Sequence, residues 1–278
     1  MIVDAHHHFW DPGRADYPWL TDELATIRRA FGPADLAPEL EAAGVEATVL
    51  VQTRSSLNET VEFLETAEAT PFVRGVVGWV DLTDPAVADV IARLRGGRGG
   101  DRLVGIRHQA HDEPDPDWLV RDDVVRGIRA VGSAGLVYDL LVRPRELPAA
   151  LALTRRLHDV RFVIDHLAKP PIATGELAPW EGRMAPFREL EHVGCKVSGM
   201  VTEADWSSWT PHDLRPYIDR VLDVFGPDRL LFGSDWPVCL LAASYGDVVA
   251  AAGATLSGLS ESDRAKVFGG TATAVYRL

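Results

Sequence analysis

Eight short apolar runs alternate with longer amphipathic stretches along nearly the whole of this 278-residue chain. Several runs are apolar throughout, as expected of parallel strands that are covered on both faces. Eight strand–helix units predict a TIM-like (β/α)8 barrel rather than an open sheet. The predicted strands are Ile2–Phe9, Ala47–Gln52, Phe72–Val80, Leu103–His108, Leu136–Val142, Arg161–His166, Cys195–Ser198 and Leu230–Ser234.

The stretches between and after these strands have the spacing of amphipathic helices. No linker, repeat or low-complexity segment divides the chain, so we expect residues 1–278 to form a single barrel domain. No Gly-x-Gly-x-x-Gly motif or P-loop follows any strand, which removes the usual signal for a nucleotide-binding sheet. The predicted helices are Leu57–Glu68, Pro85–Leu94, Val124–Ala134, Glu146–Leu157, Pro186–His192, Leu214–Phe225, Tyr245–Ala252 and Ser260–Phe268.

Composition limits the kinds of molecule that this protein is expected to bind. A formal net charge of −13 argues against a nucleic-acid or anionic-membrane partner, and no apolar run is long enough to span a membrane. Two cysteines, Cys195 and Cys239, are too few for a disulfide framework, and each lies in or beside an apolar segment. We therefore expect both to be buried thiols in a cytoplasmic protein.

Polar, reactive side chains recur at the carboxyl ends of the predicted strands. In a barrel these ends converge on one face, where catalytic residues gather. This recurrence predicts an active site on that face. The residues are His6, His8, Gln52, Trp79, Asp81, Arg107, His108, Asp139, Asp165, His166, Ser234 and Asp235.

The first strand carries a His-x-His pair. Because strand side chains alternate, His6 and His8 share one face, whereas His7 points into the helix layer. Such a pair can bind a metal ion, or it can direct two imidazole N–H groups at one carbonyl oxygen. By the same alternation, at most one of Arg107 and His108 faces the barrel axis. Asp139 is either a site residue or a partner for an arginine.

Two loops that follow strands carry aromatic residues among acids. The segment from Trp10 to Phe31 contains Tyr17 and Trp19, and the loop after the seventh strand contains Glu203, Asp205, Trp206 and Trp209. Aromatic faces beside polar groups suit stacking on a sugar-like ring, although simple packing explains such loops as well.

An ordered set of segments spanning nearly the full chain resembles the amidohydrolase superfamily. Within it, the set resembles the lactonase branch of L-fuconolactonases, L-rhamnono-lactonases and 2-pyrone-4,6-dicarboxylate lactonases, and is most similar to the sugar lactonases. The segments are Asp4–Trp10, Tyr17–Leu20, Gly78–Leu82, Gly105–His108, Tyr138–Leu141, Asp165–Pro171, Cys195–Gly199 and Phe232–Pro237.

The resemblance implies a distorted (β/α)8 barrel with His6, His8, His166 and Asp235 at its active face. Metal-rich members of the superfamily add a lysine or glutamate on the fourth strand and a histidine on the fifth. Here those strands carry Arg107-His108 and Asp139, so we do not expect a binuclear centre.

We therefore expect hydrolysis of a sugar lactone, with L-fucono-lactone as the leading substrate. Asp235 would be the general base for water, and His6, His8 and His166 would polarise the lactone carbonyl. The alternative mechanism uses a single zinc ion bound by the same four residues, and we expect this ion not to be essential. The expected substrate contacts are Arg107, His108, Gln52, Trp79, Asp139 and Trp10.

Two other functions remain open from the sequence. One is a zinc-dependent decarboxylase on the same barrel, and the other is a sugar-binding barrel without turnover. Neither function implies a nucleic-acid or membrane partner.

Overall fold

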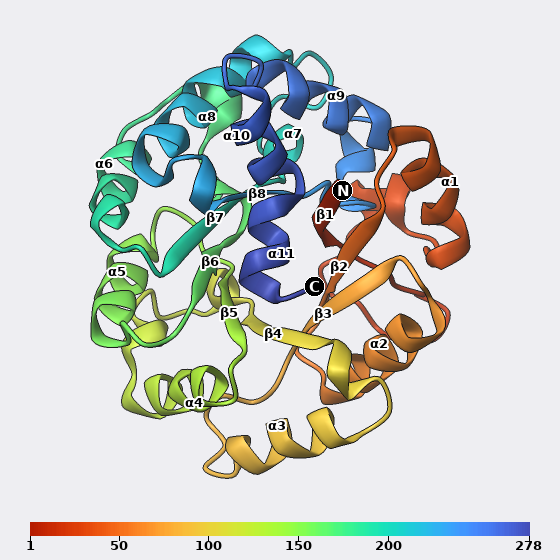
Figure 1. The fold of residues 1–278 in the computed structure, drawn as a ribbon, viewed down its shortest axis with the longest axis vertical. Coiled ribbons are helices and arrows are strands. Elements are labelled where there is room, and N and C mark those ends of the chain that lie inside the picture. Colours follow the sequence, from red (N-terminus) through yellow and green to blue (C-terminus); the bar gives the residue numbers. More distant parts are fainter.

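The computed structural model describes residues 1–278 and contains one eight-stranded sheet. Each strand pairs in parallel with the next strand along the chain, from β1 to β8, and helices surround the ring (Figure 1). The predicted (β/α)8 barrel is therefore confirmed. The strands are β1 Val3–His7, β2 Ala47–Val51, β3 Val73–Gly78, β4 Leu103–His108, β5 Val137–Leu140, β6 Phe162–Ile164, β7 Val193–Val197 and β8 Leu230–Phe232.

The ring is closed where β8 meets β1. The closing contact is a bridge between His7 and Trp236, just beyond the end of β8. The His8 N–H donates to the Trp236 carbonyl at 2.7 Å, and the Asp235 N–H donates to the His6 carbonyl at 2.8 Å. Closure at this end brings the first and last strands together where both carry the expected catalytic residues.

The α-helices depart from prediction in several places, and the short helices Met200–Glu203 and Thr271–Tyr276 were not predicted. A helix at Pro33–Ala43 was missed, although Pro33 occupies its first turn and Gly44 ends it with a left-handed backbone, both usual helix signals. The predicted helix Pro186–His192 was wrong: the chain instead forms α6 and a short 3-10 helix, η7 at Ala185–Glu189. The α-helices are α1 Pro33–Ala43, α2 Leu57–Ala69, α3 Val87–Gly96, α4 Asp122–Ser133, α5 Leu147–Arg156, α6 Trp180–Met184, α7 Met200–Glu203, α8 Pro211–Phe225, α9 Tyr245–Thr255, α10 Glu261–Ala265 and α11 Thr271–Tyr276.

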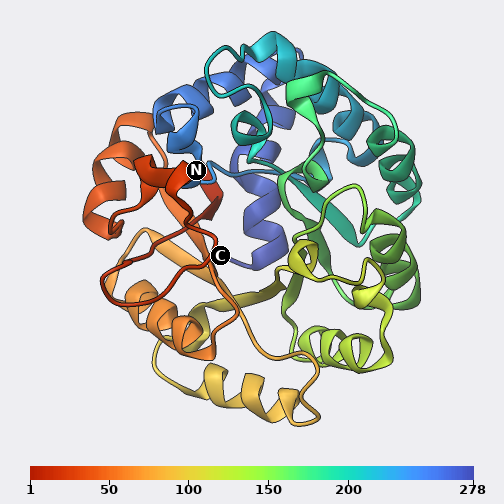
Figure 2. The ribbon, with the colours of Figure 1, turned by 180° about the vertical axis from the view of Figure 1, so that it is seen from behind.

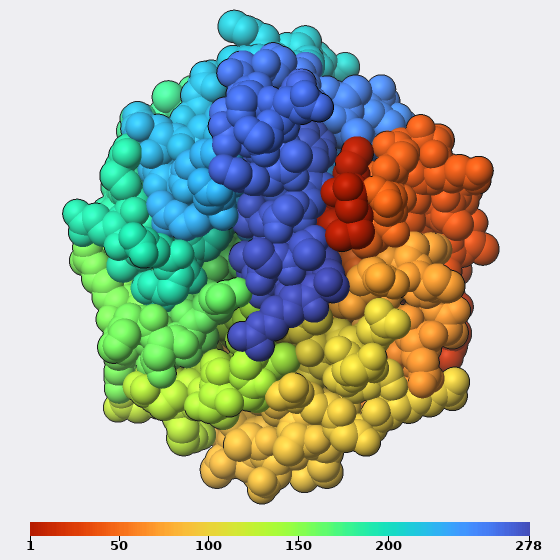
Figure 3. All heavy atoms as spheres, in the orientation of Figure 1, coloured from red at the N-terminus to blue at the C-terminus, as the bar shows by residue number.

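The last helix, α11, covers the amino-terminal end of the barrel. It crosses the middle of the ring in Figure 1, and the C-terminal segment fills the same place in Figure 3. Its Ala272 and Tyr276 belong to a cluster of 11 buried apolar residues with Val3, Ala47 and other strand residues. Since these come from strands all around the ring, the cluster is the apolar filling of the barrel interior.

A bulge in β1 places His6 in that interior. Asp4 lies opposite Thr48 of β2 and His7 lies opposite Leu50, so β1 holds one residue more than its partner between these points. Ala5 belongs to the interior cluster, and without the bulge the next residue, His6, would face the helix layer. The bulge turns His6 inward, and His8 then follows on the same side.

Two minor expectations can also be compared with the structure. Cys195 and Cys239 are buried and free, as expected. None of the helices combines the length and the apolar character needed to cross a membrane.

Candidate active site

A cavity of about 380 Å³ opens at the carboxyl ends of the strands. The loops that follow the strands surround it, on the face seen in Figure 2, away from α11. Four of its lining residues were expected from the sequence: His8, Arg107, His166 and Asp235.

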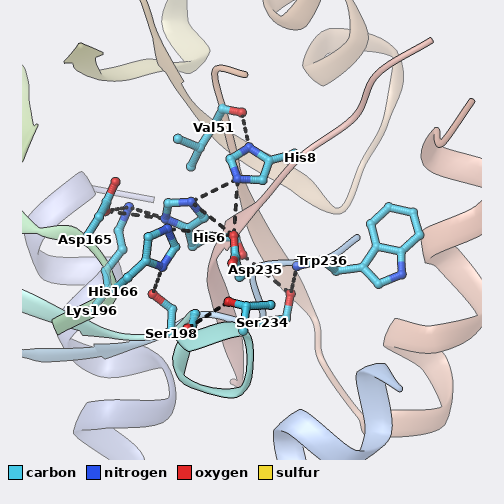
Figure 4. Close-up of polar contacts among 12 residues, drawn as sticks. His6, His8, Val51, Asp165, His166, Lys196, Ser198, Ser234, Asp235 and Trp236 are labelled. Carbon is cyan, nitrogen blue, oxygen red and sulfur yellow. Dashed lines mark hydrogen bonds and ion pairs between the residues drawn. The ribbon is translucent and has the colours of Figure 1, made fainter. Parts of the chain in front are cut away.

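Three imidazoles converge on the carboxylate of Asp235 (Figure 4). The Asp235 Oδ1 atom lies 3.4 Å from His8 Nε2 and 3.8 Å from both His6 Nε2 and His166 Nε2. The His6 and His8 Nε2 atoms lie 3.1 Å apart. All four side chains are almost completely buried, so this is a dry, closely spaced acid–imidazole cluster.

Two of these residues have an unusual backbone. His166 lies in the segment that follows β6 and Asp235 in the segment that follows β8, and their φ angles are +53° and +58°. A left-handed conformation is uncommon for residues other than glycine, and such strain tends to persist at functional sites. Here it turns both side chains towards the barrel axis after their strands end.

The Nδ1 atoms of His8 and His166 also have hydrogen-bond partners. His8 Nδ1 lies 2.7 Å from the Val51 carbonyl oxygen, which can only accept, so His8 carries its proton on Nδ1. His166 Nδ1 lies 2.9 Å from the Ser198 hydroxyl, which can either donate or accept. Both rings therefore present Nε2 to the cavity.

Burial sets the charge state of the cluster. It lowers the pKa of His166 to about 3, and burial together with the nearby Lys196 holds the pKa of His6 well below its ordinary value. Burial on its own would raise the pKa of Asp235, but His166 and His8 outweigh it, and the pKa of this carboxyl is lowered. At neutral pH the Asp235 carboxylate is thus ionised, and the His6 and His166 imidazoles are neutral.

Three of these residues, His6, His8 and Asp235, fit a single zinc ion. Tetrahedral zinc with ligand distances of about 2.0–2.1 Å separates its ligand atoms by roughly 3.3 Å. The Nε2 and Oδ1 atoms of His6, His8 and Asp235 lie 3.1–3.8 Å apart, and each imidazole has a polar partner near Nδ1. The donor set can hold a metal.

Arg107, and not His108, faces the barrel axis. Its guanidinium donates to Asp165 Oδ2 at 2.9 Å and to the side-chain and backbone oxygens of Gln52. The Arg107 Nη1 atom also lies 3.2 Å from His6 Nε2. Gln52 is fully buried, does not line the cavity, and holds Arg107 through its side-chain and backbone oxygens.

Four other expected substrate contacts also lie outside the cavity. The indole N–H of Trp79 donates to His108 Nδ1 at 3.0 Å, and the His108 ring stacks on Trp118 at 4.2 Å between centroids. Asp139 is fully buried and pairs with Lys196 at 2.6 Å. It is therefore the partner of a basic side chain, as one of the two expectations had it, but that side chain is a lysine and not an arginine. Trp10 donates its indole N–H to the Ile27 carbonyl and lines a separate cavity beside α2. Packing inside the loops and the barrel interior therefore keeps Trp79, His108, Asp139 and Trp10 out of the lining of this cavity.

The structure adds residues that the sequence did not single out. Trp19 lines the cavity, and its buried indole N–H has no partner. Lys169 lines the cavity as well and pairs with Glu203 at 2.7 Å. Lys196 on β7 lies inside the barrel, 3.2 Å from His6 Nδ1. Trp19 and Glu203 were visible as members of the aromatic and acidic loops, but Lys196 within a strand carried no such signal.

Comparisons with known proteins agree with the fold. The sequence model of the amidohydrolase family matches residues 3–278. The chain is 41% identical over 290 residues to the L-fucono-1,5-lactonase of Burkholderia multivorans, covering 100% of this chain and 96% of that protein. It is also 41% identical to the L-fucono-1,5-lactonase of Burkholderia ambifaria, covering 99% and 95%. A crystal structure of an amidohydrolase from Burkholderia multivorans with bound zinc superposes with a TM-score of 0.95 at 39% identity, covering 100% of this chain and 99% of that one.

Proposed function

The chain belongs to the amidohydrolase family, and on this basis we propose that it hydrolyses a sugar lactone, with L-fucono-1,5-lactone as the leading substrate. The coarser assignment, a hydrolase that acts on a cyclic ester, matches the name shared by two relatives that align over almost the full chain. The observation that carries the proposal is the convergence of the Asp235 carboxylate on three buried imidazoles beside a cavity.

Asp235 is the proposed general base. Its carboxylate is ionised, and it lies 3.4 Å from His8 Nε2, which carries no proton because the His8 proton is on Nδ1. A water molecule beside this pair finds two acceptors for its two hydrogens and presents its lone pairs to the lactone carbonyl carbon. General-base assistance of this kind contributes about 10²–10⁴-fold. The proton taken by Asp235 then goes to the leaving ring oxygen.

The developing negative charge on the carbonyl oxygen needs hydrogen-bond donors. His8 cannot be one, so the expected three-histidine donor set reduces to His6 and His166. His166 can carry its proton on Nε2, since Ser198 can donate to its Nδ1. Each donor of this kind contributes on the order of 10²–10³-fold. The cation of Arg107 lies next to His6 and adds positive potential to the same region.

The cavity walls would bind the sugar. Trp19 offers an unpartnered N–H, and Trp206 offers an aromatic surface at the cavity edge. Lys169 and Glu203 add a donor and an acceptor for hydroxyl groups. A zinc ion held by His6, His8 and Asp235 would supply Lewis acidity towards the carbonyl, and we propose that the reaction does not require it.

A lactone panel tests the proposed function. Enzyme is mixed with L-fucono-1,5-lactone and other aldonolactones in weak buffer, and acid release is followed with a pH indicator against the spontaneous rate. We expect rapid acid release from L-fucono-1,5-lactone. Carbon dioxide evolution from aromatic acids would instead favour a decarboxylase. Ligand binding without release of acid or carbon dioxide would favour a sugar-binding barrel.

A further inference from the structure

A line of buried polar groups runs through the barrel from α11 to the catalytic cluster. Tyr276 of α11 donates its hydroxyl to Asp139 of β5, at 2.8 Å from Oδ2. The Lys196 ammonium lies 2.6 Å from the same carboxylate and 3.2 Å from His6 Nδ1. Tyr276 is 2% exposed, and Asp139, Lys196 and His6 are fully buried, so no bulk water competes for these bonds.

The contact between His6 and His8 decides where the His6 proton resides. Their Nε2 atoms lie 3.1 Å apart, a distance that requires one proton between them. A neutral His8 cannot supply it, because its one proton is donated from Nδ1 to the Val51 carbonyl at 2.7 Å. With His8 neutral, the proton between the two rings belongs to His6 Nε2. A neutral His6 protonated there has a bare Nδ1, which is the atom that faces Lys196 (Figure 4).

We propose that Lys196 is a positioning residue that holds His6 as the Nε2–H tautomer in the metal-free enzyme. The hydrogen bonds then run in one direction, from Lys196 Nζ to His6 Nδ1 and from His6 Nε2 to His8 Nε2. When substrate enters, the same His6 Nε2–H is available for the carbonyl oxygen. Asp139 bonds Lys196, and Tyr276 of α11 bonds Asp139, so the helix that covers the amino-terminal end of the barrel also supports the site. The catalytic meaning of this arrangement rests on the proposed function, but the tautomer itself does not.

Arg107 and Asp165 offer the opposite arrangement. Arg107 Nη1 can donate to His6 only if Nε2 is bare, in which case the ring proton lies on Nδ1. Asp165 Oδ1 lies 3.4 Å from His6 Nδ1 and could accept that proton, although it also pairs with the Lys196 ammonium at 2.9 Å. This second tautomer leaves two bare Nε2 atoms facing each other, which is unfavourable unless a cation lies between them. A zinc ion would therefore require the His6 proton to move from Nε2 to Nδ1, from the Lys196 arrangement to the Asp165 arrangement.

Nitrogen-15 NMR of histidine side chains tests the tautomer without substrate. Spectra are recorded on chelated, verified metal-free protein, and His6 is assigned from the cross-peaks that disappear in His6→Gln. We expect the Nε2–H pattern for His6 in the wild type. The variant Lys196→Met/Asp139→Asn removes one positive and one negative charge together, and we expect it to show the Nδ1–H pattern. The control Lys266→Met/Asp228→Asn removes an exposed pair of the same kind, whose atoms lie 2.9 Å apart, and should keep the wild-type pattern.

The same variants separate positioning from general destabilisation. We expect the buried double variant to lower kcat of metal-free hydrolysis about 10²-fold, the effect of losing one oxyanion donor, with KM within about twofold. An Nδ1–H tautomer in the wild type would overturn the proposal, as would a buried double variant that keeps Nε2–H. If that variant fails to fold, the wild-type spectrum alone still decides. Because the spectrum needs no substrate, failure of lactone hydrolysis would leave the tautomer result standing.

Discussion

At the scale of single residues, two tryptophans from the same loop have different surroundings. Trp10 is buried, and its N–H is bonded to the Ile27 carbonyl at 3.1 Å, so it packs the loop against the barrel. The Trp19 ring meets it edge-on at 5.0 Å between centroids, but the Trp19 N–H has no partner and its side chain lines the cavity. An unpartnered buried donor beside a cavity is costly unless a ligand satisfies it. Trp19 is therefore the better candidate for contact with substrate.

Substituting each tryptophan should separate these roles. Trp19→Phe should raise KM for the lactone about fivefold with kcat little changed, the effect of losing one hydrogen bond of about 1 kcal/mol in both ground and transition states. Trp10→Phe should lower the free energy of unfolding by about 1–2 kcal/mol and leave KM unchanged. Steady-state kinetics and urea unfolding measure both. A higher KM in Trp10→Phe, together with a lower free energy of unfolding in Trp19→Phe, would contradict these roles.

The four residues proposed as catalytic were easier to place from the sequence than the residues that contact them. His6, His8, His166 and Asp235 each stand at a strand end, which strand alternation and the barrel rule both identify. His6 nevertheless faces inward only because of the β1 bulge, and no residue pattern in β1 signals that bulge. Lys196 and Asp165 pair across β6 and β7 at 2.9 Å, and such a contact depends on strand register, which sequence alone does not provide.

At the scale of elements, a glycine after β7 gives His166 its place. Gly199 has φ +62°, and a Cβ there would lie 2.5 Å from His166 Nδ1. Gly175, in the loop before α6, has a similar φ of +70° but open space around its would-be Cβ. Both positions require a left-handed backbone, but only Gly199 has a side chain, that of His166, close enough to clash with an added Cβ.

Alanine substitutions should therefore act differently at these two glycines. Both Gly199→Ala and Gly175→Ala should cost roughly 1–2 kcal/mol of stability, the penalty of a left-handed alanine. Only Gly199→Ala should also displace His166 and break its contact with Ser198, lowering kcat by about 10²-fold. Thermal unfolding and steady-state kinetics on both variants provide the comparison. Equal loss of activity in the two variants would contradict this role for Gly199.

The ends of the strands and helices were partly predictable from the local sequence. The strands were placed within a few residues because their apolar runs are short and bounded by turn residues. The region around α6 failed because Pro179 and Pro186 interrupt the helical pattern, and the chain forms two short turns whose periodicity is too brief to recognise. The short α11 is defined by packing against the barrel interior, and its own sequence gives little helix signal.

At the scale of the whole molecule, the C-terminal helix is joined to the barrel by a polar contact inside an apolar cluster. The Tyr276 hydroxyl bonds both oxygens of Asp139, at 2.9 and 2.8 Å. The neighbouring Tyr138 of β5 faces the opposite way, and its buried hydroxyl has no partner. The chain thus contains one buried tyrosine hydroxyl that is hydrogen-bonded, on Tyr276, and one that is not, on Tyr138.

Removing each hydroxyl should affect stability in opposite ways. Tyr276→Phe should lower the free energy of unfolding by about 1–3 kcal/mol, because Asp139 loses a donor in a buried site. Tyr138→Phe should be neutral or slightly stabilising, since it removes an unsatisfied polar group. Urea unfolding of both variants measures this difference. A larger loss in Tyr138→Phe would contradict the account of how α11 is attached.

The central claim is that the Asp235 carboxylate, working with neutral imidazoles, hydrolyses a lactone without needing a metal. The most direct test is kcat/KM for L-fucono-1,5-lactone with chelated, verified metal-free enzyme, comparing the wild type with Asp235→Asn and with Asp16→Asn, a change at an exposed aspartate. We predict that the wild type and Asp16→Asn remain fully active, and that Asp235→Asn loses about 10²–10⁴-fold. A wild type that loses its activity with the metal, or an Asp235→Asn variant within about threefold of the wild type, far short of the loss of a general base, would contradict the claim.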